Sequence, residues 1–312
     1  MVKYLFLAFL VISTLLFKVN DVKGQTLRTV CRLPAIVEET SGIEYVSDDI
    51  FWTFNDSGGE PELYLCDTLG NLLKTVYIQN AWNRDWEDIT QDVSGNLYIG
   101  NVGNNENKET DLTIFKIANP IDSDSAIAEI ITFRYEDQHS FPPGLDSLYF
   151  DCESLMWWDH HLYLCTKNRT DPFDGLTLLY CLPDTAGTFI AEKIGVFDTG
   201  GSPKENHWIT AGDISDDGRQ MCLLSSDKIW LFYNYEDDHF FSGEVRQINL
   251  GHLSQKEAIC FLSDKQLLIT DEEGPFNSGR NLYLYSIDSQ IISHSNSNKK
   301  KSQRHRDSKS FH

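Results

Sequence analysis

Short apolar runs alternate with turns rich in Gly, Asn and Asp along almost the whole chain, from residue 27 to residue 287. Runs of this length that are rich in β-branched and aromatic residues, and that are bounded by such turns, are typical of β-strands. Hardly any window shows the 3.6-residue period of an amphipathic helix. The pattern therefore predicts an all-β protein.

The predicted strands fall into five repeats, each of which opens with a similar triplet. The triplets are Ser41-Gly42-Ile43, Glu87-Asp88-Ile89, Glu153-Ser154-Leu155, Gly212-Asp213-Ile214 and Glu257-Ala258-Ile259. Each is followed by a second apolar strand and then by a third that is rich in Leu and Tyr. Four short strands in a unit of about 45 residues are typical of the blades of a β-propeller.

The fifth repeat has no fourth strand, whereas a strand-like segment at 27–36 precedes the first repeat. A ring in which the two ends of the chain share one blade leaves no bare sheet edge. We therefore predict one domain, residues 25–290, that forms a five-bladed β-propeller closed by its N-terminal strand. Six blades is the alternative count, because the second and third repeats are long.

The two ends of the chain differ from the repeats. Residues 1–24 have Lys3, an uncharged apolar run at 4–17 and a small residue before Gln25, which predicts a signal peptide. The run is short for a membrane span, so we expect a mature monomer without a transmembrane segment, secreted or periplasmic. Residues 291–312 are polar and basic, which predicts a disordered tail.

The chain carries 26 basic and 47 acidic residues, a formal net charge of −21. Such a field disfavours nucleic acid as a partner and favours cations, although an acidic surface can also serve solubility alone. The seven cysteines include no C-x-x-C pair and lie mostly within apolar runs, as buried small residues do. A bridge between Cys152 and Cys165 is the alternative.

The first position of each triplet is the first candidate for chemistry, because the innermost strands of a propeller face one another across its channel. The residues at this position are Ser41, Glu87, Glu153 and Glu257. Gly212 breaks the series, with Asp213 and Thr210 beside it. Converging carboxylates bind a cation or take up protons, and Ca²⁺ prefers six to eight oxygen ligands. We predict a calcium site made of Ser41, Glu87, Glu153, Asp213 and Glu257, with a solvated channel mouth as the alternative.

The ends of the second strands lie on the same face of the ring, because these strands run antiparallel to the first. Polar and basic residues gather there, and we expect five of them to contact a small anionic ligand: Arg84, Asn101, Lys167, Arg169 and Arg280. Each of these can equally be an ordinary surface residue. The chain has no G-x-S-x-G, H-E-x-x-H, Walker or EF-hand motif, which excludes the common enzymes that carry them.

Two resemblances follow from these motifs. The segments Phe54-Asn-Asp-Ser-Gly58, Asp85-Trp-Glu-Asp-Ile89 and Gly100-Asn-Val-Gly-Asn-Asn105 resemble a family of uncharacterised exported bacterial β-propeller proteins. The order Ser41, Glu87, Glu153, gap, Glu257 is more distantly similar to the calcium-activated nucleotidases of the apyrase type. That likeness implies a five-bladed propeller with a central calcium ion, and it departs at Gly212, where a serine is expected.

Two functions agree with these observations. The first is a binding scaffold with an axial calcium site, whose partner is a small anionic ligand or an extracellular protein. The alternative is a calcium-dependent phosphohydrolase that acts on nucleotides or phosphate esters, with the metal polarising a phosphoryl oxygen. In that case Glu87, Asp88 or Asp271 is the expected base.

Overall fold

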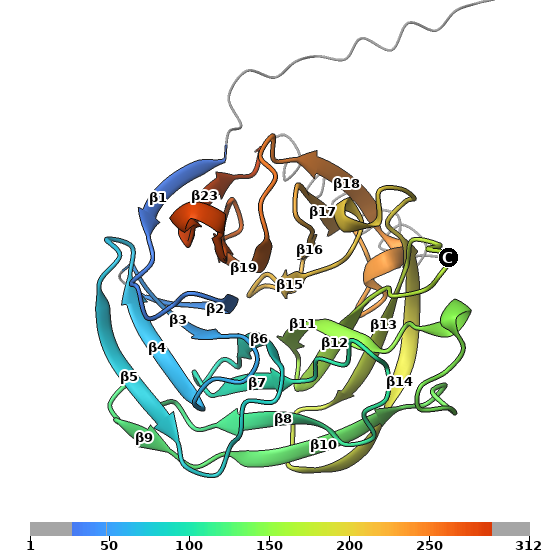
Figure 1. Cartoon of the computed structure of the whole chain (residues 1–312), viewed down its shortest axis with the longest axis horizontal. Coiled ribbons are helices and arrows are strands. Elements are labelled where there is room, and N and C mark those ends of the chain that lie inside the picture. Colours follow the sequence, from blue (N-terminus) through green and yellow to red (C-terminus); the bar gives the residue numbers. More distant parts are fainter. Residues whose placement is uncertain (1–26, 48, 289–312) are drawn as a thin grey trace, which may run out of the picture.

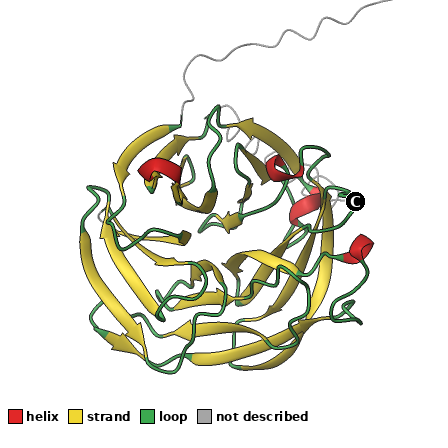
Figure 2. Ribbon diagram, in the orientation of Figure 1, coloured by secondary structure: helices red, strands yellow, loops and turns green. Residues whose placement is uncertain are grey.

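The computed structural model describes residues 27–47 and 49–288, so the predicted signal peptide and basic tail lie outside it. Within these ranges the protein is all-β, and its only helices are four short 3-10 turns: η1 (Leu145–Ser147), η2 (Lys204–Asn206), η3 (Phe240–Ser242) and η4 (Pro275–Asn277). Figure 2 shows the helical turns in red, in the connections between strands. No helix of the described part has the length and apolar character needed to cross a membrane.

The strands form successive antiparallel sets of four, and each of the first four sets runs outward in chain order. These sets are β2 (Thr40–Ser47), β3 (Ile50–Asn55), β4 (Glu62–Asp67) and β5 (Leu72–Ile78); β6 (Trp86–Gln91), β7 (Leu97–Asn101), β8 (Leu112–Ile117) and β10 (Glu129–Tyr135); β11 (Asp151–Trp158), β12 (His161–Lys167), β13 (Leu176–Pro183) and β14 (Gly187–Asp198); and β15 (Ala211–Ile214), β16 (Gln220–Leu224), β17 (Lys228–Tyr233) and β18 (Glu244–Asn249).

The last set joins the two ends of the described chain. It contains β19 (Lys256–Ser263), β20 (Gln266–Asp271), β23 (Asn281–Ser286) and the N-terminal strand β1 (Arg28–Arg32), which pairs antiparallel with β23. This is the pairing that the missing fourth strand of the fifth repeat predicts, and it covers the edge of β23. Three further two-residue strands are β9 (Ser125–Ala126), β21 (Glu273–Gly274) and β22 (Ser278–Gly279).

The innermost strands close into a ring around a central axis (Figure 1). Along this ring β2 packs against β6, β6 against β11, β11 against β15, β15 against β19, and β19 against β2. This arrangement is that of a β-propeller. At the rim, β10 and β14 pair in parallel, so that the second and third sets share one eight-stranded sheet.

The hydrophobic core lies between neighbouring sheets, where apolar side chains of adjacent sets meet. Trp86 is fully buried, and its ring lies edge-on to Phe54 of the preceding sheet, with 5.3 Å between the ring centroids. Aromatic pairs in this geometry are favourable beyond the area that they bury. All seven cysteines are free thiols, so Cys152 and Cys165 form no bridge although they lie on neighbouring strands.

Candidate functional site

Four of the innermost strands carry a β-bulge at the position that the repeats predict for metal ligands. The bulged residues are Ser41, Glu87, Glu153 and Glu257, each of which the register of the strand pair skips. A bulge turns one residue out of the ladder and re-aims its side chain. All four residues are buried, with at most 9% of their surface exposed. These four positions are therefore equivalent, as predicted, because the backbone forms a bulge at each of them.

The fifth innermost strand, β15, has no bulge, and this corrects the prediction for Asp213. The Thr210 hydroxyl donates to the carbonyl oxygen of Lys256 at 2.6 Å, much as the Ser41 hydroxyl donates to that of Glu87 at 2.9 Å. Thr210 thus takes the position that the sequence assigned to Gly212. The Asp213 carboxylate instead accepts the backbone N–H of Phe261 at 2.7 Å. Phe261 lies four residues beyond Glu257, about 13 Å along the strand, so Asp213 lies outside the ring.

Two groups of carboxylates meet at Glu87. We name Glu87, Asp151 and Glu153 the inner carboxylates, because all three are buried, and Asp56, Asp85 and Glu87 the outer carboxylates, because Asp56 and Asp85 are partly exposed. Within each group, one oxygen atom from each residue lies within 4.8 Å of the others. Oxygen atoms at this spacing can share one cation, and Glu87 belongs to both groups.

Two cationic side chains contact the inner carboxylates. The Lys167 ammonium lies 2.9 Å from Glu153 Oε1. Arg169 Nε lies 2.6 Å from Asp151 Oδ2, and its Nη2 lies 3.3 Å from Glu153 Oε1. Burial lowers the pKa of Lys167, but the charges of Glu153 and Glu257 outweigh this effect and raise it overall. The inner carboxylates are therefore partly neutralised by the protein itself.

The Glu87 carboxylate differs from its neighbours because it forms no hydrogen bond and no ion pair with any residue in the described ranges. Only 5% of the residue is exposed. Burial raises the pKa of Glu87 well above its usual range, and the charges of Glu153 and Asp56 raise it further. A buried carboxylate without a partner is costly, so this side chain is suited to a cation.

Gly103 allows two carboxylates to approach the backbone. A Cβ atom at this position would lie 2.2 Å from Asp85 Oδ2 and 2.2 Å from Glu87 Oε1. No real Cβ contact is this short, so any larger residue must push both carboxylates out of place.

We therefore expect Gly103→Ala to weaken Ca²⁺ binding by about tenfold or more, since displaced supporting groups typically cost 10- to 100-fold in metal affinity. Isothermal titration calorimetry measures the change. Gly201→Ala is the matched control, because a Cβ there meets no atom within 4 Å. Equal affinities in the two variants would contradict the role of Gly103.

A cationic rim lies beside the carboxylates, formed by Lys167, Arg169 and Lys204 around the ring of Trp208. The three charges lie 5.7, 5.0 and 5.1 Å from the ring centroid, respectively. Lys204 is exposed and forms no ion pair in the described part of the chain. A partly exposed aromatic face with cations beside it can contact an anionic, flat ligand.

The other predicted ligand contacts have partners of their own. Arg84 pairs with Glu109 at 3.1 Å and Asp111 at 2.9 Å. Asn101 Oδ1 accepts the backbone N–H groups of Arg84 and Asp85, which fixes the loop that carries Asp85. Arg280 Nε lies 3.2 Å from Glu273. Of the predicted anion contacts, the structure thus brings Lys167 and Arg169 to the carboxylates, whereas Arg84 and Arg280 bind elsewhere.

Two of the three predicted bases are held in structural hydrogen bonds. Asp88 is fully buried and accepts the backbone N–H groups of Ile89 and Leu155, both at 2.9 Å. Asp271 is also buried, and it accepts the backbone N–H of Asn281 at 2.8 Å and the hydroxyl of Tyr283 at 2.7 Å. The contacts with Leu155 and Asn281 join strands, and the expectation that either residue acts as a base stays a prediction. Glu87 is the predicted base that remains available.

The site also contains three acidic residues that the sequence analysis did not assign as ligands: Asp56, Asp85 and Asp151. Asp56 and Asp85 lie within the Asn-Asp-Ser and Asp-Trp-Glu-Asp motifs, where a strand ends or begins on the ring face. Burial raises the pKa of Asp56 to about 7, and the nearby charge of Asp85 contributes to the increase. Their position at the ends of strands is the signal that could have identified them.

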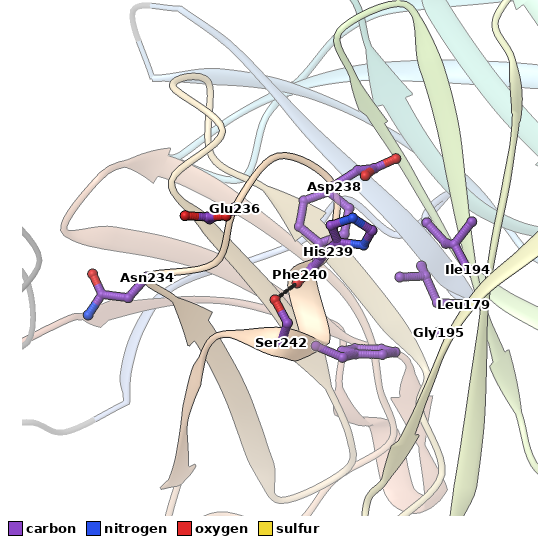
Figure 3. Close-up of a pocket in the computed structure, with 10 residues that line it drawn as sticks. Leu179, Ile194, Gly195, Asn234, Glu236, Asp238, His239, Phe240 and Ser242 are labelled. Carbon is purple, nitrogen blue, oxygen red and sulfur yellow. Dashed lines mark hydrogen bonds between the residues drawn. The ribbon is translucent and has the colours of Figure 1, made fainter. Parts of the chain in front are cut away.

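A separate cavity of about 500 Å³ lies away from this site, between β13, β14 and the η3 segment (Figure 3). Leu179 and Ile194 form one side of it, and Glu236, Asp238 and His239 lie on the other. None of the predicted site residues lines this cavity.

Comparisons with known proteins find similarity in structure alone. No family model and no curated protein matches the chain. The PQQ-bound aldose sugar dehydrogenase of Streptomyces coelicolor is 7% identical over 84% of this chain and 98% of its own, with a TM-score of 0.49. The calcium-binding protein regucalcin of Agrobacterium tumefaciens is 15% identical over 80% of this chain and 76% of its own, with a TM-score of 0.44.

A gluconolactonase of Xanthomonas campestris is 11% identical over 80% of this chain and 72% of its own, with a TM-score of 0.43. Likeness at this level carries no information on activity or ligands. The two family resemblances drawn from the sequence motifs therefore stay predictions. What the strand order and the ring of inner strands establish is an all-β propeller with a buried acidic group that could bind a metal.

Proposed function

We propose that the protein is an exported five-bladed β-propeller that binds Ca²⁺ at Glu87 and its neighbouring carboxylates, and that serves as a scaffold for a small anionic ligand. The observation that carries this proposal is the Glu87 carboxylate, which is 5% exposed, forms no hydrogen bond or ion pair with the described residues and faces other carboxylates. Carboxylate and hydroxyl oxygens are the ligands that Ca²⁺ prefers. Export rests on residues 1–24 of the sequence.

The residues present fit such an ion. Glu87, Asp151 and Glu153 supply hard oxygen donors, and Gly103 leaves the space in which two of the carboxylates meet the backbone. When bound, the ion would supply positive charge to balance these carboxylates and to attract an anion. Lys167 and Arg169 orient Asp151 and Glu153, because each holds at least one carboxylate oxygen in a fixed place.

The anionic ligand is proposed to lie between the metal and the cationic rim. Arg169 contacts the inner carboxylates on one side and Trp208 on the other, so the rim begins where the carboxylates end. Binding is favoured over hydrolysis because Asp88 and Asp271, two of the groups expected to act as a base, are engaged in joining strands.

Titration with phenyl phosphate, a probe with an aromatic ring and a phosphate, tests this function through tryptophan fluorescence. We expect binding in Ca²⁺ and none in a chelator. Lys204→Met should weaken binding about fivefold, since an exposed charge contact contributes about 1 kcal/mol. Lys108→Met is the control, because Lys108 pairs with Glu106.

Equal binding with and without Ca²⁺ would contradict the proposed cooperation of metal and anion. Release of inorganic phosphate from the probe in Ca²⁺ would favour the phosphohydrolase instead.

A further inference from the structure

We infer that the site holds two divalent cations, one at the inner and one at the outer carboxylates, with Glu87 bridging them. This inference rests on the proposed function, in that it concerns the same acidic site, and it adds a second ion at Asp56, Asp85 and Glu87. Two ions that share a carboxylate lie about 3.5–4 Å apart in known two-metal sites.

The carboxylate oxygens of each group lie close enough together to share an ion. One oxygen atom from each of Asp56, Asp85 and Glu87 lies within 4.8 Å of the other two, and the same holds for Glu87, Asp151 and Glu153. These residues come from three successive sets of strands: Asp56 directly follows β3, Asp85 directly precedes β6, and Asp151 begins β11. A residue that belongs to both groups is placed as a bridging ligand.

Two carboxylates of the site have oxygen atoms without hydrogen-bond partners. Asp56 Oδ1 is buried and has no hydrogen-bond partner. The Glu87 carboxylate, nine-tenths or more buried, has none among the described residues either. Leaving buried oxygens unpaired costs about 1–3 kcal/mol each. A cation that contacts both carboxylates would remove this cost while both groups stay ionised.

The cationic side chains are distributed unequally between the two groups of carboxylates. Lys167 and Arg169 both contact the inner carboxylates, and neither forms an ion pair with Asp56 or Asp85. Arg84 is next to Asp85 in the chain, but its guanidinium pairs with Glu109 and Asp111. The outer carboxylates therefore have no ion pair of their own, although the charges of Arg84, Arg169 and Lys167 act on Asp85 from a greater distance. A single ion at the inner carboxylates would leave Asp56 and Asp85 without a cation in direct contact.

The two groups of carboxylates differ in their exposure to solvent. Asp56 and Asp85 are partly exposed, whereas Asp151 and Glu153 are buried. An ion at the outer carboxylates would therefore face the channel mouth and keep positions open for water or for an anion. In this arrangement the inner ion would hold the strands together, and the outer ion would contact the ligand.

Calcium titration of the chelator-treated full chain, followed by calorimetry, tests the inference through the stoichiometry. We expect two ions per chain in the wild type and one in Asp85→Asn, which removes a ligand of the outer group alone. Asp56→Asn should give the same result through a different sheet. Glu106→Gln, an exposed residue that pairs with Lys108, should retain two ions.

Manganese provides an independent readout, because two Mn²⁺ ions that share a carboxylate couple magnetically, and electron paramagnetic resonance detects the coupling. We expect a coupled spectrum in the wild type and an uncoupled spectrum in Asp85→Asn. One ion per chain, or two uncoupled ions, would overturn the bridged site and leave the proposed function standing. No bound ion at all would overturn both.

Discussion

Replacing Glu87 with Gln is expected to abolish calcium binding at both carboxylate groups and to stabilise the metal-free protein. Glu87 is the residue that the two groups share, so its charge is lost from both sites at once. We expect the affinity to fall by at least about 100-fold, the upper end of what loss of a mere supporting residue causes.

The stabilisation has a separate electrostatic cause. In the metal-free protein, two ionised carboxylates whose oxygens lie within 4.8 Å of each other repel by about 3 kcal/mol or more at an effective dielectric constant of about 20. Burial raises the pKa of Glu87, and this repulsion raises it further. Because partial protonation already relieves some of it, we expect Glu87→Gln to raise the free energy of unfolding by about 1 kcal/mol in a chelator.

Thermal unfolding with and without Ca²⁺ measures both effects. At a concentration 100 times the Kd, one bound ion stabilises the folded protein by about 2.7 kcal/mol. The wild type and the Glu106→Gln control should show a calcium-dependent rise in Tm, whereas Glu87→Gln should show none. A normal calcium response in Glu87→Gln, or a fall in its metal-free Tm, would contradict the assignment of Glu87 as the central ligand.

The ring positions were predictable because the chain repeats them. Ser41, Glu87, Glu153 and Glu257 each stand before an apolar pair at the start of an inner strand, and in each case the backbone forms a bulge there. The sequence shows the repeat but not the bulge. In the fourth repeat the letters Asp-Ile match those of the second, although β15 lacks the extra residue.

The wrong position of Asp213 follows from that difference. Because β15 has no bulge, Asp213 and Asp88 do not occupy equivalent positions on their strands, although the sequences around them match. Thr210 occupies the ring position instead. Register is a tertiary property that depends on pairing with the neighbouring strand. A single sequence therefore could not distinguish Thr210 from Gly212 at this position.

The remainder of the site depends on distances between repeats. Lys167 and Arg169 were assigned to the correct face, because the ends of second strands lie there, but nothing in their sequence shows that they pair with Glu153 and Asp151. Arg280 occurs in a similar context and pairs with Glu273 instead. Side-chain partners of this kind are set by packing, whereas the strand pattern sets only the face.

The other end of the inner strands carries a second acidic group, which is expected to make stability depend on pH. Asp213 accepts the backbone N–H groups of Ile214 and Phe261, both at 2.7 Å, and therefore links β15 to β19. Glu44 on β2 and Asp88 on β6 lie near it, as does the exposed Asp216. Burial raises the pKa of Asp213 from 3.8 to about 7.

The sign of the effect follows from linkage. Because the pKa of Asp213 is higher in the folded than in the unfolded protein, the folded state binds the proton more tightly between about pH 4 and pH 7. Its contribution to stability is fully present below about pH 4 and is lost as the pH rises through 7. One proton corresponds to a slope of at most about 1.4 kcal/mol per pH unit. Asp213→Asn removes the titrating group, so its free energy of unfolding should fall less steeply with pH than that of the wild type.

Urea unfolding in a chelator, at intervals from pH 4 to pH 8, gives the two curves, and the chelator keeps metal binding out of the comparison. The informative quantity is the difference in slope between the wild type and Asp213→Asn, because acidic residues far from Asp213 titrate equally in both. Asp122→Asn is the matched control, since Asp122 is exposed and lies in the loop between β8 and β9, on a different set of strands from Asp213, and its substitution should leave the slope unchanged. Parallel curves for the wild type and Asp213→Asn would show that Asp213 is ionised throughout, held so by its two backbone hydrogen bonds.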